Sequence, residues 1–281
     1  MYFLAGSLPG EALLHLRQLT IFGMISRLPQ CLLHEIAVRA FSSNTPPPAR
    51  SWFSGILKLC IRYDLDHPRD LLSFPPPKPS FKKIIRKKVL DFWEQRLRDE
   101  AEDPRYSSLT FFKPRFMSLT SPHPLWTSAG SSPSRIAMAT VQAQMISGRY
   151  RSESLCRHWS RNKMGFCLLS SNHREVIEDV THILKDCDAL QDTRLKLLSY
   201  TRSYCQGIPT YLSDLILSFM DFTSPNFGQF LLDCSVLPDV IRATQDYDAA
   251  TIHHHTFMIS RTWVYSLHKR RMTLLGRWNF C

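Results

Sequence analysis

Proline is distributed very unevenly along this chain of 281 residues. Of its 18 prolines, 15 precede residue 135, and the whole chain contains only 10 glycines. A proline inside a helix removes a backbone hydrogen bond, and its ring clashes with the preceding turn. The distribution therefore predicts a first half that loops divide into short segments and a second half that is more continuous and helical.

Apolar residues recur at helical spacing, whereas no strict alternation marks a sheet and no internal repeat is found. Helices are predicted near 13–28, 32–41, 52–63, 81–103, 134–147, 189–205, 210–220, 226–235 and 251–275. Ser80 is the expected N-cap of the long helix, because a serine oxygen can accept a hydrogen bond from a first-turn amide. Gly148 and Gly276 are expected to end the helices that precede them. The predicted fold class is mainly α, an irregular multi-helix assembly with proline-rich linkers.

Basic residues clearly outnumber acidic ones in this chain. There are 35 lysines and arginines against 24 aspartates and glutamates, which gives a formal net charge of +11. A surplus of this size favours a polyanionic partner such as RNA or DNA. Because 44% of the residues are hydrophobic, wholesale disorder is excluded.

The N-terminal sequence MYFLAGSLPGEALLHLRQL has no basic region before its apolar stretch, unlike a signal peptide. The most apolar window, 18–26, is only half of the roughly 18 residues that a membrane span needs. The eight cysteines are scattered along the chain, which favours free thiols or metal ligands over disulfides. We expect an intracellular protein, nuclear or cytoplasmic, that is neither secreted nor bound to a membrane.

Signatures of the common catalytic sites are missing from the sequence. It has no G-x-S-x-G elbow, no Walker loop, no G-x-G-x-x-G and no H-E-x-x-H. The neighbouring acids Glu178 and Asp179 would point about 100° apart on a helix, which prevents them from sharing a substrate. We expect no enzymatic activity and no small-molecule substrate.

Two cysteines and two histidines form the pattern C-x5-H-x8-H-x4-C at Cys167, His173, His182 and Cys187. Structural zinc takes four sulfur or nitrogen ligands in a tetrahedron, usually as two close pairs. His182 and Cys187 have a suitable spacing at the end of a predicted short helix, 174–185. This pattern predicts a small zinc-binding insert in the helical assembly.

The other half of this pattern leaves the fourth ligand open. A C-x2-C spacing would place a second thiolate at position 170, where the chain has Ser170. His173 could restore the ligand, as could Cys156 or His158 from upstream. Three interpretations remain: an intact zinc site, a degenerate site, and a coincidence of buried cysteines with ordinary histidines.

Two groups of basic residues are candidates for nucleic-acid binding. The first, Lys82, Lys83, Arg86 and Lys87, lies on one face of the predicted long helix, opposite its apolar stripe. Cations at a helix N-terminus oppose the helix dipole, so helix stability does not explain their placement. A phosphate-binding face would explain it, and the alternative is a solvated face that packing tolerates.

The second group combines cations with aromatic rings, as proteins that bind single-stranded nucleic acid do. It consists of Arg149, Tyr150, Arg151, Arg157, His158, Trp159 and Arg161. The alternative is that these residues make ordinary contacts between domains.

The last predicted helix carries Ile259, Trp263 and Leu267 at four-residue spacing, which predicts a core stripe. The basic run 269–271 that follows is expected in solvent or against phosphate. The three histidines at 253–255 are consecutive, so their side chains diverge around a helix and do not predict a metal site.

Several segments are distinctive when they are taken together. The most specific are GRYRSESLCRHWS (148–160), GFCLL (165–169) and VTHILKDC (180–187), and the others are 3–29, 111–126 and 230–280. These segments resemble the extreme C-terminal region of LINE-type (non-LTR) retrotransposon polyproteins, over nearly the whole chain. In such polyproteins this region follows the reverse transcriptase and carries a C-C-H-C zinc knuckle that helps to engage template RNA or target DNA.

The resemblance implies ligand roles for Cys167, His182 and Cys187, whereas the family's second cysteine has no counterpart at Ser170. Neither the [FY]-x-D-D motif of polymerases nor an endonuclease catalytic set occurs in the sequence. The chain is therefore expected to be a fragment or decayed genomic copy, a reverse transcriptase by descent alone.

These observations together predict a non-catalytic protein that binds single-stranded or structured RNA or DNA. The expected regions are a helical segment left from an upstream domain (1–41), a proline-rich linker with a short helix (42–80), a basic helical region (81–148), a zinc-knuckle-like module (149–190) and a C-terminal helical domain (191–281). The rival hypotheses are a helical scaffold that docks proteins and a translated pseudogene fragment without a selected role.

Overall fold

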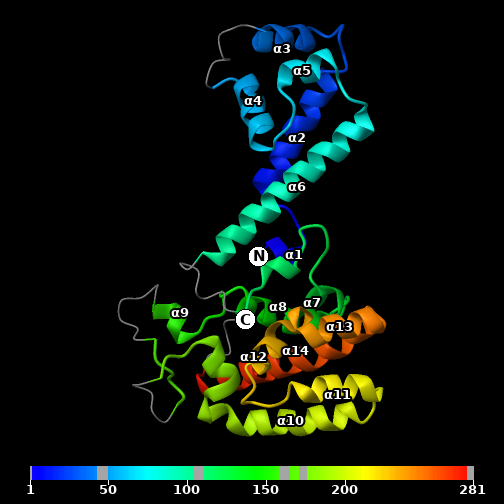
Figure 1. Ribbon diagram of the computed structural model, residues 1–281. Coiled ribbons are helices and arrows are strands. Elements are labelled where there is room, and N and C mark those ends of the chain that lie inside the picture. The colour runs from blue at the N-terminus through cyan, green and yellow to red at the C-terminus, as the bar shows by residue number, and fades with distance from the viewer. Residues whose placement is uncertain (1, 43–49, 104–110, 158–164, 171–175, 277–281) are drawn as a thin grey trace. The chain divides into compact units, whose positions relative to one another are not determined.

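The computed structural model describes residues 2–42, 50–103, 111–157, 165–170 and 176–276. Within these residues helices are the only regular elements, and the only β pairing is an antiparallel bridge between Phe166 and Ile177. The mainly α class that the periodicity predicts is therefore confirmed (Figure 1). No helix in the described ranges is both long enough and apolar enough to cross a bilayer.

The described residues form two compact units, each with its own core. The N-terminal unit comprises Tyr2–Glu102 and Ser118–Ser121. The C-terminal unit comprises Asp103–Met117 and the described residues from Pro122 onward. The long helix that carries the first basic group therefore belongs to one unit, and the Cys/His segment belongs to the other.

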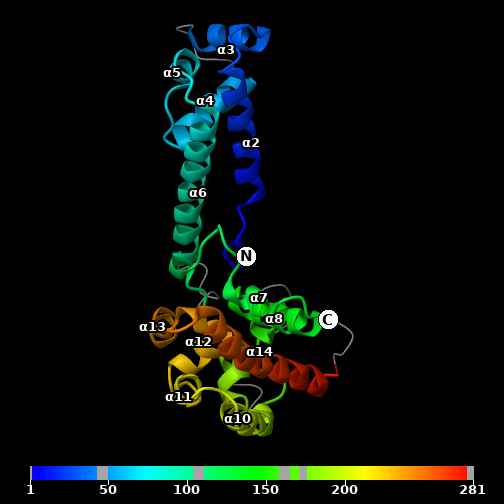
Figure 2. The same ribbon diagram turned by 90° about the vertical axis from the view of Figure 1, so that its right-hand side faces the viewer.

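The N-terminal unit is built around two long helices that lie side by side, α2 and α6 (Figures 1 and 2). Its helices are α1 (Tyr2–Ala5), α2 (Gly10–Ile25), α3 (Leu32–Ser42), α4 (Trp52–Arg62), α5 (Pro68–Ser73) and α6 (Lys78–Glu102). Phe81, Ile85, Val89 and Trp93 form the buried stripe of α6. This stripe follows the predicted helical period and places the exposed cations of α6 on the opposite face.

Gly23 allows α2 and α6 to approach closely. A Cβ atom added at Gly23 would lie well inside contact distance of the Phe81 ring. α6 begins at Lys78, so the prediction that Ser80 is its N-cap is wrong. Pro79 explains the earlier start, because a first-turn proline loses no helical hydrogen bond and its fixed φ suits the helix.

The C-terminal unit surrounds its longest helix, α14 (Ala249–Leu274), which runs between α8 and the pair α10 and α11 (Figures 1 and 2). The other helices are η2 (Pro114–Phe116), α7 (Pro124–Thr127), α8 (Pro133–Ile146), α9 (Glu153–Arg157), η3 (His182–Asp186), η4 (Asp188–Leu190), α10 (Gln191–Cys205), α11 (Thr210–Ser218), α12 (Asn226–Asp233), η5 (Cys234–Val236) and α13 (Pro238–Asp246). Ile259, Trp263 and Leu267 are fully buried, which confirms the predicted core stripe.

Some of the buried polar side chains in this unit make hydrogen bonds that join distant helices. The indole nitrogen of Trp263 donates to Thr201 at 2.8 Å. The side-chain amide of Gln142 on α8 donates to the carbonyls of Leu231 (2.7 Å) and Leu232 (2.8 Å). The bonds of Gln142 join α8 to the end of α12, and the bond of Trp263 joins α14 to α10, so together they help to define how the helices pack.

Proline starts helices as well as interrupting them. Pro68, Pro124, Pro133 and Pro238 stand at the first turns of α5, α7, α8 and α13. Of these helices, only α8 was predicted from apolar spacing. The glycine stops were predicted correctly, since Gly148 follows α8 with φ +64° and a similar left-handed glycine follows α14.

Candidate metal centre

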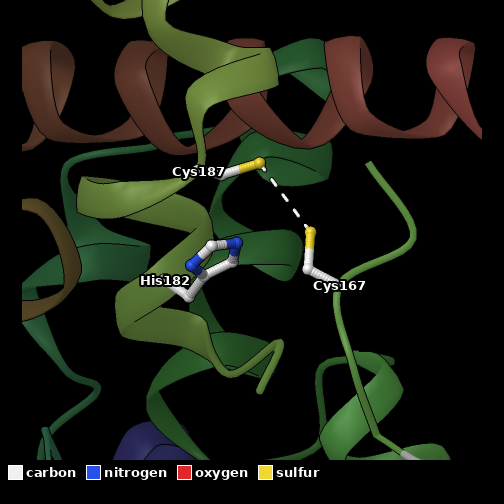
Figure 3. A group of neighbouring side chains, drawn as sticks. All are labelled: Cys167, His182 and Cys187. Atoms are coloured by element: carbon white, nitrogen blue, oxygen red, sulfur yellow. Dashed lines mark hydrogen bonds between the residues drawn. The ribbon is translucent and has the colours of Figure 1, made fainter. Parts of the chain in front are cut away.

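Three of the four residues in the Cys/His pattern come together in the folded chain. One ligand atom each from Cys167, His182 and Cys187 lies within 4.8 Å of the others, and all three residues are buried (Figure 3). The two Sγ atoms are 3.9 Å apart, so they are separate thiols and not a disulfide. Tetrahedral bonds of 2.3 Å to one zinc ion would place two sulfurs about 3.8 Å apart.

Cys167 reaches the site from an extended segment. Gly165 precedes it in the left-handed region at φ +80°, and Phe166 pairs with Ile177 in the antiparallel bridge. The amide of Cys167 donates to the carbonyl of Val176 at 2.8 Å. The bridge therefore fixes the position of the first thiol against the chain that leads to His182.

His182 and Cys187 come from the two ends of the π-helical turn η3. The amide of Cys187 donates to the carbonyl of His182 at 2.8 Å, which closes the turn over five residues. Asp179 supports the start of the turn, because its carboxylate accepts from the amide of His182 at 2.7 Å. The wider turn places both side chains on the side that faces Cys167 (Figure 3).

The short helix predicted for 174–185 is wrong over residues 176–179. Residues 176–179 are extended, and the helical turn begins only at Val180. Val176 and Ile177 are β-branched and pair with the segment of Cys167, which competes with helix formation. The predicted grouping of His182 with Cys187 nevertheless holds, because η3 supplies it.

One nitrogen of the site has no hydrogen-bond partner among the described residues, and one thiol resists ionisation. The Nε2 atom of His182 is buried and has no hydrogen-bond partner among the described residues. Burial, reinforced by the neighbouring Cys167, raises the pKa of the Cys187 thiol to about 12. A divalent cation would accept the ring nitrogen and stabilise both thiolates, so the donor set and its spacing suit a metal ion.

The surroundings of Cys187 also hold a buried cation. Arg194 on α10 donates to the carbonyl of Cys187 at 2.5 Å and to the side chain of Gln191. Burial lowers the pKa of Arg194, and the nearby Cys187 opposes that effect. Arg194 thereby links Cys187, at the end of η3, to α10 and helps to keep His182 and Cys187 in place.

A fourth ligand is not established within the described residues. His173 and His158, two of the predicted alternatives, lie outside the described ranges. Cys156 on α9 does not join the group, and Ser170 is buried. Three protein ligands can still hold a metal ion whose fourth position another donor completes.

The predicted nucleic-acid residues have mixed outcomes. Lys82, Lys83, Arg86 and Lys87 are exposed on α6, and in the C-terminal unit Arg149, Arg151 and Arg157 are exposed. Trp159, His158 and Arg161 lie outside the described residues. Exposure leaves these described cations accessible to phosphate, but it does not distinguish a binding face from a solvated one.

Two residues of the basic segments are buried, contrary to expectation. Tyr150 contributes to the core, where its hydroxyl lies 2.9 Å from Nδ1 of His268, so its ring is not a stacking platform. Arg271 of the C-terminal basic run pairs with Glu178 and is also buried. The sequence pattern did not single out Glu178 as a core residue, because nothing local to it marks a distant arginine as its partner.

Comparison with protein-family models, curated proteins and solved structures found no match for this chain. The site's geometry is therefore the main evidence from which a function can be argued.

Proposed function

We propose that this chain is a non-catalytic nucleic-acid-binding protein whose segment 149–190 is held together by a structural zinc ion. The observation that carries the proposal is the convergence of Cys167, His182 and Cys187 next to a segment with exposed arginines. The proposed role of zinc is to supply folding energy and no chemistry, with a fourth donor that completes the three ligands of the described residues.

The resemblance to the C-terminal region of LINE-type polyproteins supports the same proposal. It implies these three ligands, and the described residues bring the same three together. Arg149, Arg151 and Arg157 flank the site in sequence and expose their side chains. Guanidinium groups bind phosphate oxygens in a bidentate manner, so these arginines are the expected contacts to single-stranded RNA.

The proposal is tested by binding of the full chain to a fluorescent single-stranded RNA at several salt concentrations. Replacing Arg149, Arg151 and Arg157 by glutamine should lower the slope of log K against log salt by about 2, at roughly 0.7 per phosphate contact. The matched control replaces Lys196, Arg202 and Arg242, which are exposed in the same unit and carry the same total charge. Equal slopes for the two triple variants would contradict the proposed interface.

A protein-docking scaffold is the second candidate, and exposed apolar side chains on α2 and α3 favour it. Leu13, Leu14, Leu32 and Leu33 are each more than half exposed. Exposed apolar groups of this kind mark surfaces that other proteins cover. If the RNA affinity is low and independent of salt, this candidate replaces the first.

A further inference from the structure

A cavity of about 490 Å³ lies in the C-terminal unit, away from the Cys/His group in sequence. The turn between α7 and α8, the first turn of α8 and the first turns of α14 line it. Its volume falls within the range of small-molecule sites in proteins, about 300–1,000 Å³. No carboxylate is among its lining residues, whereas an arginine and three histidines are.

Arg135 is the charged group at the cavity wall. Its side chain is half-buried, and it makes no hydrogen bond or ion pair with any residue in the described ranges. His254 and His255 line the same wall, and the Nδ1 atom of His255 lies 2.7 Å from the hydroxyl of Tyr204. The cavity thus presents a guanidinium without a counter-ion, beside imidazole rings.

A second arginine lies behind the cavity wall. Arg261 is fully buried on α14. Its guanidinium donates to two oxygens of the lining residue Ser128, the hydroxyl at 3.0 Å and the backbone carbonyl at 3.2 Å. Its other hydrogen bond is to the carbonyl of Leu125, and its Nε atom has no partner among the described residues. Every acceptor of this buried cation is therefore a neutral oxygen.

The two guanidinium groups repel each other. Burial and, to a lesser extent, the nearby charge of Arg135 together lower the pKa of Arg261 to about 10. A buried cation without a carboxylate partner is costly to maintain. An anion in the cavity would offset both the repulsion and the missing counter-charge.

Acidic groups around the cavity are already engaged. Asp248 caps α14 and accepts from the amide (2.8 Å) and hydroxyl (2.5 Å) of Thr251. Asp233 lies 3.3 Å from the Nε2 atom of His123, and its charge acts on the cavity-lining His253. Because Asp248 takes the donors of Thr251, the positive charge at the cavity comes from Arg135 and not from the helix N-terminus. Burial lowers the pKa of His253 and of His255, so these rings contribute hydrogen bonds rather than charge.

We infer that this cavity binds a phosphate monoester, with Arg135 as the direct contact and Arg261 as a charge behind the wall. A dianionic phosphate fits a planar guanidinium fork, and histidine rings can donate further hydrogen bonds. The phosphate belongs either to the 5′ end of a nucleic-acid strand or to a free nucleotide. The inference is independent of the proposed RNA interface, because it needs neither the zinc ion nor Arg149, Arg151 and Arg157.

Calorimetric titration of the full chain with inorganic phosphate and with AMP tests the inference. Arg135→Gln should weaken both affinities about 10- to 100-fold, the cost of losing a charge-assisted contact. Arg135→Lys should lose less, because it keeps the charge but not the fork. Arg242→Gln, an exposed arginine outside the cavity lining, should leave both affinities unchanged.

Oligonucleotides identify the source of the phosphate. If the 5′-phosphorylated form of a single-stranded RNA binds more tightly than its 5′-hydroxyl form, and Arg135→Gln removes the difference, the ligand is a strand end. If AMP binding depends on Arg135 but the two strands bind alike, the ligand is a free nucleotide. The inference is overturned if Arg135→Gln changes the affinity for none of these probes. Binding of the 5′-hydroxyl strand is a separate result, which supports the RNA interface and does not rescue the cavity inference.

Discussion

Arg271 on α14 and Glu178 beside the Cys/His group form a buried ion pair. The guanidinium donates to both carboxylate oxygens, at 2.5 and 3.3 Å, and both side chains are almost wholly enclosed. The carboxylate also accepts from the amide of Glu153, and the backbone of Glu178 pairs with Gly165 and Ser154. The pair therefore holds the extended residues 176–179, which pair with the segment of Cys167 and precede η3, against α14.

The pKa of Arg271 reflects this arrangement. Burial by itself would lower the pKa of the guanidinium, but its hydrogen bonds to Glu178 and the proximity of Tyr150 outweigh burial and leave the pKa raised. The guanidinium of Arg271 consequently stays charged throughout the ordinary pH range.

Arg271→Met is expected to lower the free energy of unfolding by about 3–5 kcal/mol, because it leaves the carboxylate of Glu178 buried and unpaired. Urea unfolding of the full chain measures the loss. The matched control is Arg270→Met, at the exposed neighbouring position, which should cost less than about 0.5 kcal/mol. A small effect of Arg271→Met would show that water or another group replaces the arginine.

Removal of one thiol is expected to abolish metal binding. Cys187→Ser should lower the zinc content of purified protein from near one equivalent to near zero, because serine is a poor zinc ligand in such a site. Elemental analysis measures the content, with Cys205→Ser, a buried cysteine of α10, as the control that keeps its metal. A chelator should lower the unfolding temperature of the wild type and of the control, and it should leave Cys187→Ser unchanged.

Acid is expected to weaken the C-terminal unit through His268. Burial, with help from the charge of Arg271, lowers the pKa of His268 to about 4, against 6.5 in an unfolded chain. The folded state therefore binds fewer protons, so the stability is complete above about pH 6.5 and is lost as the pH falls toward 4. The full difference is about 3 kcal/mol at 1.36 kcal/mol per pKa unit.

Urea unfolding at pH 7 and at pH 4.5 checks this dependence. His268→Gln should flatten the fall in the free energy of unfolding between these two values, since glutamine does not titrate. An identical pH dependence of wild type and His268→Gln would rule out His268 as the cause.

The basic face of α6 gives a prediction that is separate from the metal centre. If Lys82, Lys83, Arg86 and Lys87 contact phosphates, replacing all four by glutamine should reduce the salt slope for single-stranded RNA by about 3. A control with the same loss of charge replaces Arg17, Arg39, Lys58 and Arg69, which are exposed elsewhere in the N-terminal unit. If both variants bind RNA alike, the face of α6 is only solvated.

Two helical glycines should respond in opposite directions to alanine. At Gly23 the added methyl group would meet the Phe81 ring, and such overpacking costs about 1–3 kcal/mol. At Gly55 on α4 the added methyl group meets no atom within 4 Å, so the better helix propensity of alanine should raise stability by up to about 1 kcal/mol. Thermal unfolding of the two variants distinguishes close packing of α2 on α6 from a loose contact.

Much of the helical architecture could be predicted because apolar spacing is a local signal. The stripe of Ile259, Trp263 and Leu267 in α14 needs only the helical period to be recognised as core. The short helices α5, α7 and α13 were missed, because each starts at a proline that apolar spacing alone treats as a break. A proline at the first helical position is the signal that could have found them.

The candidate site could be predicted only in part. The x4 spacing of His182 and Cys187 indicated a local pair, but it did not show that a π-helical turn would form it. The burial of Tyr150 and Arg271 depends on His268 and Glu178, partners more than 90 residues away in each case. Such long-range pairing leaves no periodic pattern in the sequence. From the sequence alone, a basic residue that is buried in an ion pair therefore cannot be distinguished from one that is exposed and binds phosphate.

The turn η3 has a consequence for the order in which a metal site would assemble. His182 and Cys187 belong to one short turn, so local folding brings two donors together without the closure of a long loop. Only the arrival of Cys167 then requires a longer loop to close, and that cost rises only slowly with loop length. An ion that binds first to His182 and Cys187 would then bind Cys167, and this third bond would order the residues between them.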